Sequence, residues 1–101
     1  MRLSPPVKAV IRQLARHWYA NPLACDTPDG MLNWWLEPAN AVALTTVEEA
    51  LVWMEQRGLI EQLPAADQRV RFRRVDDDVA SRLQRIAAGL DVDDDPLGTL
   101  H

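Results

Sequence analysis

Residues 45–75 read TTVEEALVWMEQRGLIEQLPAADQRVRFRRV, and this stretch decides the fold. Thr45 or Thr46 is expected to cap a helix, because Glu48 or Glu49, three residues later, would complete a capping box. Gly58 is expected to close that helix in the left-handed conformation that glycine permits. The buried stripe of the predicted helix follows helical spacing and consists of Val47, Ala50, Leu51 and Met54.

Two short strands are predicted after this helix. Residues 59–63 form the first, residues 64–68 form a turn, and residues 69–75 form the second. Side chains alternate between the two faces of a strand, so Val70 and Phe72 are expected to point inward. The outward positions of the second strand are then basic, namely Arg69, Arg71 and Arg73.

Further helices are expected on both sides of this stretch. Ser4, Pro5 and Pro6 form a helix start, and Asn21 with Pro22 ends that helix. Its apolar face has helical spacing and contains Val7, Val10, Ile11, Leu14, Ala15 and Trp18, with a basic flank of Lys8, Arg12 and Arg16. A second helix is expected to begin at residues 27–29, to contain the apolar residues 31–36 and to end at Pro38. A last helix is expected to be capped by Asp76 or Asp77, with an apolar face of Val79, Leu83, Ile86, Ala87 and Leu90.

The helix, the Gly58-Leu59-Ile60 step and the turn with Asp67 and Arg69 together resemble the recognition helix and wing of winged-helix transcription regulators, most closely the MarR-like group. The resemblance covers residues 45–83. It implies an α+β winged helix-turn-helix fold with three helices, a two-stranded wing and a C-terminal helix. It also implies that Arg69 enters a DNA minor groove, where the potential is strongly negative, and that Asp67 holds it in place. The other candidate DNA contacts are Arg71, Arg73, Thr45 and Thr46.

The outer face of the predicted recognition helix favours a different partner. Glu48 and Glu49 would be repelled by DNA phosphates, and no basic residue precedes Arg57 in this helix. Val52 and Trp53, if exposed, are typical of an anchor for a protein partner. The usual role of the fold that the chain resembles favours DNA, so we expect a small DNA-binding regulator, with a protein-interaction module using Glu48, Glu49, Val52 and Trp53 as the alternative. The last helix could complete the core or form a homodimer seam.

Composition limits the other function classes. The chain has 101 residues, 11 basic and 15 acidic, for a net charge of −4. Residues 1–90 are expected to form one domain, followed by an acidic, disordered tail at 91–101. No apolar run approaches the ~20 residues of a membrane span, and no signal-peptide block begins the chain. We expect a soluble cytoplasmic protein in which the lone cysteine, Cys25, is an inert thiol in a loop.

No pattern indicates an enzyme, a cofactor or a metal site. His17 and His101 are far apart in the sequence, and neither has a nucleophile or metal-ligand partner at a suitable spacing. The aspartates at 91–95 lack the glycine and the distal glutamate of a calcium loop. Trp18, Trp34 and Trp35 are expected in the core. The other expected core residues are Val10, Ile11, Leu14, Leu32, Val47, Leu51, Met54, Leu59, Val70, Phe72, Leu83 and Ile86.

Overall fold

The first helix begins and ends where its sequence predicts. The computed structural model describes residues 3–36, 42–63, 69–75 and 79–89, and α1 spans Pro5–Ala20. The Ser4 hydroxyl accepts a hydrogen bond from the Val7 N–H at 3.4 Å, which satisfies one of the free donors of the first turn. At the other end, the side-chain amide of Asn21 donates to the His17 carbonyl at 3.0 Å. All six residues of the predicted apolar face are buried.

The segment after α1 contains a strand that the sequence did not reveal. Strand β1 (Cys25–Asp26) is followed by one helical turn, α2 (Pro28–Gly30), and by a π-helical segment, η1 (Met31–Trp35). The Thr27 hydroxyl caps α2 by accepting from the Gly30 N–H at 3.2 Å, so the predicted helix start is confirmed. Helical structure stops at Trp35, and Pro38, the expected end, lies outside the described residues. Cys25 is exposed but belongs to a strand, not to a loop.

Helix α3 (Leu44–Gln56) buries the predicted stripe but has a different N-terminus. The residue at its N-cap is Ala43, and no side chain caps it. Thr45 and Thr46 already lie inside the helix, so the predicted cap and capping box are wrong. The C-terminus follows the prediction: Gly58 has a φ of 73°, and the Leu59 N–H donates to the Met54 carbonyl at 3.1 Å.

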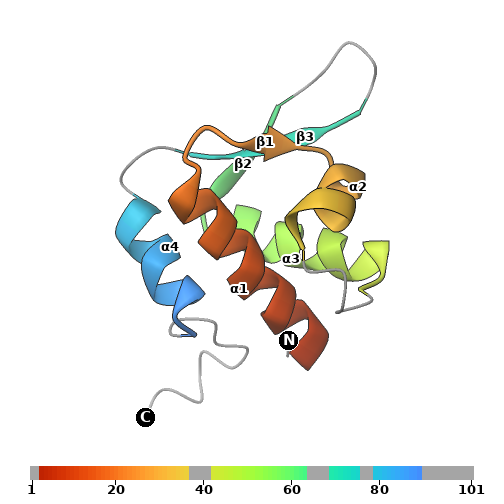
Figure 1. The fold of residues 1–101 in the computed structure, drawn as a ribbon, viewed down its shortest axis with the longest axis horizontal. Coiled ribbons are helices and arrows are strands. Elements are labelled where there is room, and N and C mark those ends of the chain that lie inside the picture. Colours follow the sequence, from red (N-terminus) through yellow and green to blue (C-terminus); the bar gives the residue numbers. More distant parts are fainter. Residues whose placement is uncertain (1–2, 37–41, 64–68, 76–78, 90–101) are drawn as a thin grey trace.

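The sheet has three antiparallel strands in the order β1-β3-β2 (Figure 1). Strands β2 (Ile60–Leu63) and β3 (Arg71–Arg74) pair with Glu61 opposite Arg73, and Cys25 of β1 lies opposite Arg73 on the other side. Phe72 points inward as predicted. Val70 precedes β3 and is 39% exposed, so its predicted place in the core is wrong, whereas Arg74 is buried.

Helix α4 (Ala80–Ala87) packs mainly against α1 and lies beside it in Figure 1. Its buried residues are Leu83 and Ile86, as predicted. Val79 occupies the N-cap position without a side-chain hydrogen bond, while Asp76, Asp77 and Leu90 lie outside the described residues. The predicted tail at 91–101 also lies outside them.

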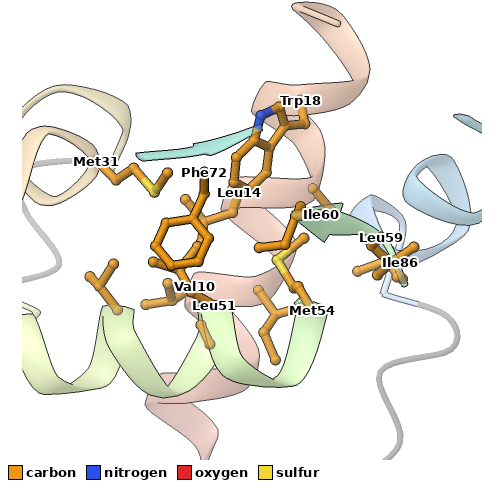
Figure 2. Close-up of a cluster of buried hydrophobic side chains, with 14 of the residues drawn as sticks. Val10, Leu14, Trp18, Met31, Leu51, Met54, Leu59, Ile60, Phe72 and Ile86 are labelled. Atoms are coloured by element: carbon orange, nitrogen blue, oxygen red, sulfur yellow. The ribbon is translucent and has the colours of Figure 1, made fainter. Parts of the chain in front are cut away.

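The core lies between α1, α3, the sheet and α4 (Figure 2). Trp18, Leu14, Leu51 and Met54 are almost fully buried at its centre, and Met31 joins them from η1. Besides Val70, three expected core residues differ: Leu32 and Trp35 are only partly buried, and Trp34 is 80% exposed. The π-helical winding of η1 buries Met31 and Trp35 more than Trp34, and an α-helical pattern does not predict that outcome. No helix in the described part of the chain is long and apolar enough to cross a membrane.

Candidate functional site

The outer face of α3 carries an open hollow on the described surface. Because α3 buries Val47, Ala50, Leu51 and Met54, the opposite stripe faces solvent at the same helical spacing. An open hollow of about 560 Å³ lies over this stripe. Its lining combines apolar and acidic side chains: Leu3, Thr45, Glu48, Glu49, Val52, Trp53 and Gln56.

Trp53 lines the hollow, and its indole ring contacts both the core and Arg57. Its ring packs partly against the core, and the Arg57 guanidinium carbon lies 4.6 Å from the ring centroid. The backbone carbonyl of Arg57 in turn accepts a hydrogen bond from Nη2 of Arg82 at 2.9 Å. A residue of α4 therefore fixes the C-terminal end of α3, and Arg57 covers one side of the indole. This arrangement restrains Trp53 at the edge of the hollow.

Val52 is the exposed apolar residue of this face. Its side chain is 51% exposed, and it lies between Glu48 and Gln56, one helical turn away on either side. An exposed valine alone is ordinary on a protein surface. Here it lies beside a partly buried indole and a partly buried leucine, Leu3, so the hollow has an apolar floor.

Glu48 and Glu49 give the hollow its charge. Both side chains are exposed, and among the described residues neither takes part in an ion pair or a side-chain hydrogen bond. The nearby acids are engaged elsewhere: the Glu55 carboxylate accepts from the Gln62 amide at 3.1 Å, and Glu61 is paired with Arg73. The negative charge of this face is therefore concentrated at Glu48 and Glu49.

The same surface extends from α3 towards the sheet. Glu48 and Val52 also line a second hollow of about 260 Å³ with Val70 and Phe72. A third hollow of similar size is lined by Glu48 and Val70 together with Asp29 and Arg69. Glu48 borders all three hollows, so it lies at the centre of one continuous surface running from α3 to the start of β3.

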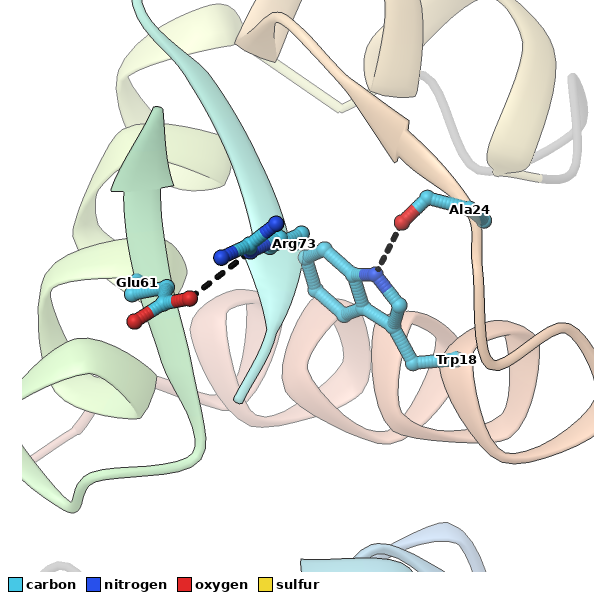
Figure 3. A network of polar contacts seen from close by, with 4 residues as sticks. All are labelled: Trp18, Ala24, Glu61 and Arg73. Carbon is cyan, nitrogen blue, oxygen red and sulfur yellow. Dashed lines mark hydrogen bonds and ion pairs between the residues drawn. The ribbon is translucent and has the colours of Figure 1, made fainter. Parts of the chain in front are cut away.

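The arginines predicted to bind DNA do not share one environment. Arg69 is exposed and lines the third hollow together with Asp29 and Glu48, while Arg71 is half-buried in β3. Arg73 points to β2, where its Nε donates to Oε2 of Glu61 at 2.7 Å (Figure 3). Arg74, which the sequence groups with them, is buried and its Nη1 lies 3.5 Å from the Trp18 carbonyl. The pleat thus separates neighbouring arginines, and Asp67 lies outside the described residues.

The two threonines predicted as DNA contacts also differ. Thr45 is exposed and lines the hollow on α3, whereas Thr46 is half-buried. The basic flank of α1 lies elsewhere: Arg12 approaches Gly89, just beyond α4, with 3.9 Å between its Cδ and the position of a Cβ added to that glycine. The structure therefore brings together Thr45, Glu48, Glu49, Val52 and Trp53.

Helical spacing alone places Gln56, one turn beyond Val52, on the outer face of α3. Several other residues that line this surface were not predicted as site residues, among them Leu3 and Asp29. Leu3 and Asp29 come from segments that no local pattern connects to α3. Their positions depend on how the chain folds back, so only the structure could reveal them.

His17 belongs to an aromatic cluster away from α3. Its imidazole stacks on Trp35 with 4.0 Å between ring centroids, and Trp35 meets Trp18 edge-on at 4.9 Å. Burial lowers the pKa of His17 below its usual value, because desolvation disfavours the imidazolium. The Trp18 indole N–H donates to the Ala24 carbonyl at 2.9 Å (Figure 3). Ring packing and this hydrogen bond together account for the cluster.

The described residues contain no group of three or more histidine, cysteine, aspartate or glutamate side chains placed to hold a metal ion. Comparison with protein-family models, with curated proteins and with solved structures gives no match for this chain. The candidate site therefore rests on the geometry of the outer face of α3 alone.

Proposed function

We propose that this chain is a winged-helix domain that binds another protein through the outer face of α3. Support for the scaffold comes from the order of elements: α1, β1, α2 with η1, α3, β2, β3 and α4. In a winged helix, α3 is the recognition helix and the β2–β3 hairpin is the wing. The added strand β1 pairs with β3 and widens the wing sheet to three strands.

One observation carries the choice of partner. The hollow on α3 has an apolar floor and two carboxylates that form no ion pair with the described residues, and the described residues that line it include no lysine or arginine. A DNA-reading helix is drawn to DNA by neutralising phosphates, and Glu48 and Glu49 would oppose that attraction. Protein interfaces instead concentrate their binding energy in aromatic and apolar anchors surrounded by polar residues. Trp53 and Val52 with their acidic neighbours fit that description.

DNA binding through the wing is the second candidate, favoured by the exposure of Arg69, which lies just before β3. Two observations weaken the case for DNA binding: Arg73 is engaged in an ion pair, and Arg74 is buried. On this reading Arg69 and Arg71 would contact phosphates, and a regulator of transcription would result.

A photo-crosslinking amino acid placed at position 52 tests the proposal in the cells that produce the protein. We expect a crosslink from position 52 to another protein, identified by mass spectrometry. The control carries the same amino acid at Gln84, an exposed residue of α4, and should not give that crosslink. A crosslink equally strong from both positions, or none from position 52, contradicts the proposal.

Fluorescence anisotropy with a labelled mixed-sequence DNA duplex tests the second candidate. Titrations at roughly 50 and 200 mM salt separate phosphate contacts from other binding, because phosphate-dominated affinity falls steeply with salt. The Arg69→Ala/Arg71→Ala variant is the matched control. Salt-sensitive binding that this variant loses would favour DNA, and no binding at the lower salt would exclude general DNA affinity.

A further inference from the structure

The charge on the α3 surface restricts which protein can cover it. Glu48 borders three hollows and Glu49 borders the largest, and both carboxylates are exposed without an ion pair among the described residues. A partner that covers Val52 and Trp53 must also approach these two charges. Burying them without cationic partners would cost desolvation energy with no compensating attraction.

A second copy of this chain fits the surface poorly. A two-fold dimer formed through α3 would place the same patch against itself, bringing Glu48 and Glu49 of one copy towards those of the other. Like charges facing each other across an interface oppose association. The occupant is therefore expected to be a different chain.

Building on the proposed function, we propose that the partner segment is cationic, with an apolar side chain seated against Val52 and Trp53 and lysine or arginine side chains facing Glu48 and Glu49. The exposed face runs from Thr45 to Gln56, about three helical turns or roughly 16 Å. A segment of that length can offer one apolar anchor and basic residues on either side. Glu48 and Glu49 then determine specificity, while the apolar floor supplies most of the affinity.

Two synthetic peptides provide the probe. Both have about 16 residues and the same leucine stripe at helical spacing; the remaining positions are lysine in one and glutamate in the other. Each is titrated into the ¹⁵N-labelled full chain while backbone amide shifts are followed by NMR. We expect the cationic peptide to shift amides of α3 and the anionic peptide to bind at least about fivefold more weakly.

A pair of variants with equal net charge isolates the role of α3. Glu48→Gln/Glu49→Gln and Gln84→Lys/Ala88→Lys both change the net charge of −4 by the same two units, and all four positions are exposed. The first variant should weaken binding of the cationic peptide about three- to tenfold, and the second should leave it unchanged. Equal weakening in both variants would show attraction by net charge and overturn the proposal.

Other outcomes also decide the question. Shifts confined to the aspartates at 91–95, or binding of neither peptide at millimolar concentration, overturn the proposal. Equal binding of both peptides to α3 overturns the cationic preference but leaves protein docking intact. A crosslink from position 52 in cells likewise supports docking independently of the peptides, so failure of this inference is distinguishable from failure of the proposed function.

Discussion

Trp18 and Trp34 are the same residue type in opposite environments. Trp18 is fully buried and donates its indole N–H to the Ala24 carbonyl, whereas Trp34 is 80% exposed. Trp18→Phe removes that hydrogen bond and leaves a small void, so we expect a loss of about 1–3 kcal/mol in the free energy of unfolding. Trp34→Phe should change it by less than about 0.5 kcal/mol. Urea denaturation followed by circular dichroism measures both, and equal losses would contradict the burial of Trp18.

His17 makes the stability of the protein depend on pH. Its pKa in the folded protein lies below the ordinary value of 6.5, because burial disfavours the charged imidazole. As the pH falls below about 6.5, the unfolded chain takes up this proton more readily than the folded one, so stability decreases until the folded pKa is reached.

The variant His17→Gln should lack this part of the pH dependence. Unfolding free energies of both proteins are measured by urea denaturation between pH 7.5 and 5.5. His101 and the carboxylates are present in both proteins, so their contributions cancel in the difference. Equal slopes for the two proteins would show that His17 is not desolvated by folding.

At the scale of the elements, α3 has no side-chain N-cap, although its sequence offers candidate capping residues. Ala43 occupies the N-cap with extended backbone angles, φ −81° and ψ 152°, and its side chain cannot accept a hydrogen bond. Ala43→Ser keeps those angles and supplies an acceptor for a free N–H of the first turn. We expect a gain of about 0.5–2 kcal/mol in the free energy of unfolding, measured by thermal and urea denaturation.

Thr45→Ala is the control for this prediction. Because Thr45 lies inside α3 and is exposed, its replacement by alanine should not destabilise the helix. If Thr45→Ala lowers the free energy of unfolding by about 1 kcal/mol and Ala43→Ser does not raise it, then Thr45 is the N-cap residue and the prediction is wrong.

Long elements with a repeated apolar spacing were predictable from the sequence, and very short elements were not. The repeated apolar spacing of α1 and α3 identified both helices and their buried faces, since many residues agree on one periodicity. Strand β1 has two residues, too few for any alternation to be visible. The cap of α3 was misplaced because adjacent Thr45 and Thr46, followed by Glu48 and Glu49, offer a capping signal that the backbone does not use.

The candidate site shows the same division between local and tertiary information. Helical spacing placed Glu48, Glu49 and Val52 on the outer face of α3, and the structure confirms their exposure. The sequence pattern could not separate the roles of the arginines in β3. Arg73 and Arg74 are neighbours in the sequence, yet one pairs with Glu61 at the surface and the other is buried against the end of α1. The register of the sheet decides this, and register depends on contacts between distant segments.

At the scale of the whole molecule, the acidic face of α3 also bears on self-association. We expect the protein to stay monomeric through this face, because a two-fold contact would oppose Glu48 and Glu49 with their own copies. Glu48→Leu/Glu49→Leu removes that repulsion and joins two leucines to the apolar floor formed by Val52, Trp53 and Leu3. An enlarged apolar patch of this kind promotes association.

Sedimentation equilibrium over a range of protein concentrations measures the outcome. The wild type should sediment near its chain mass of 11.4 kDa, and the double leucine variant should show a concentration-dependent increase. Gln84→Leu/Ala88→Leu, which adds leucines at other exposed positions, controls for general hydrophobicity. If the wild type is already dimeric and Val52→Arg dissociates it, then the face binds a second copy in spite of its charge. In that case the repulsion argument is wrong, and the cationic partner argued from it loses its basis.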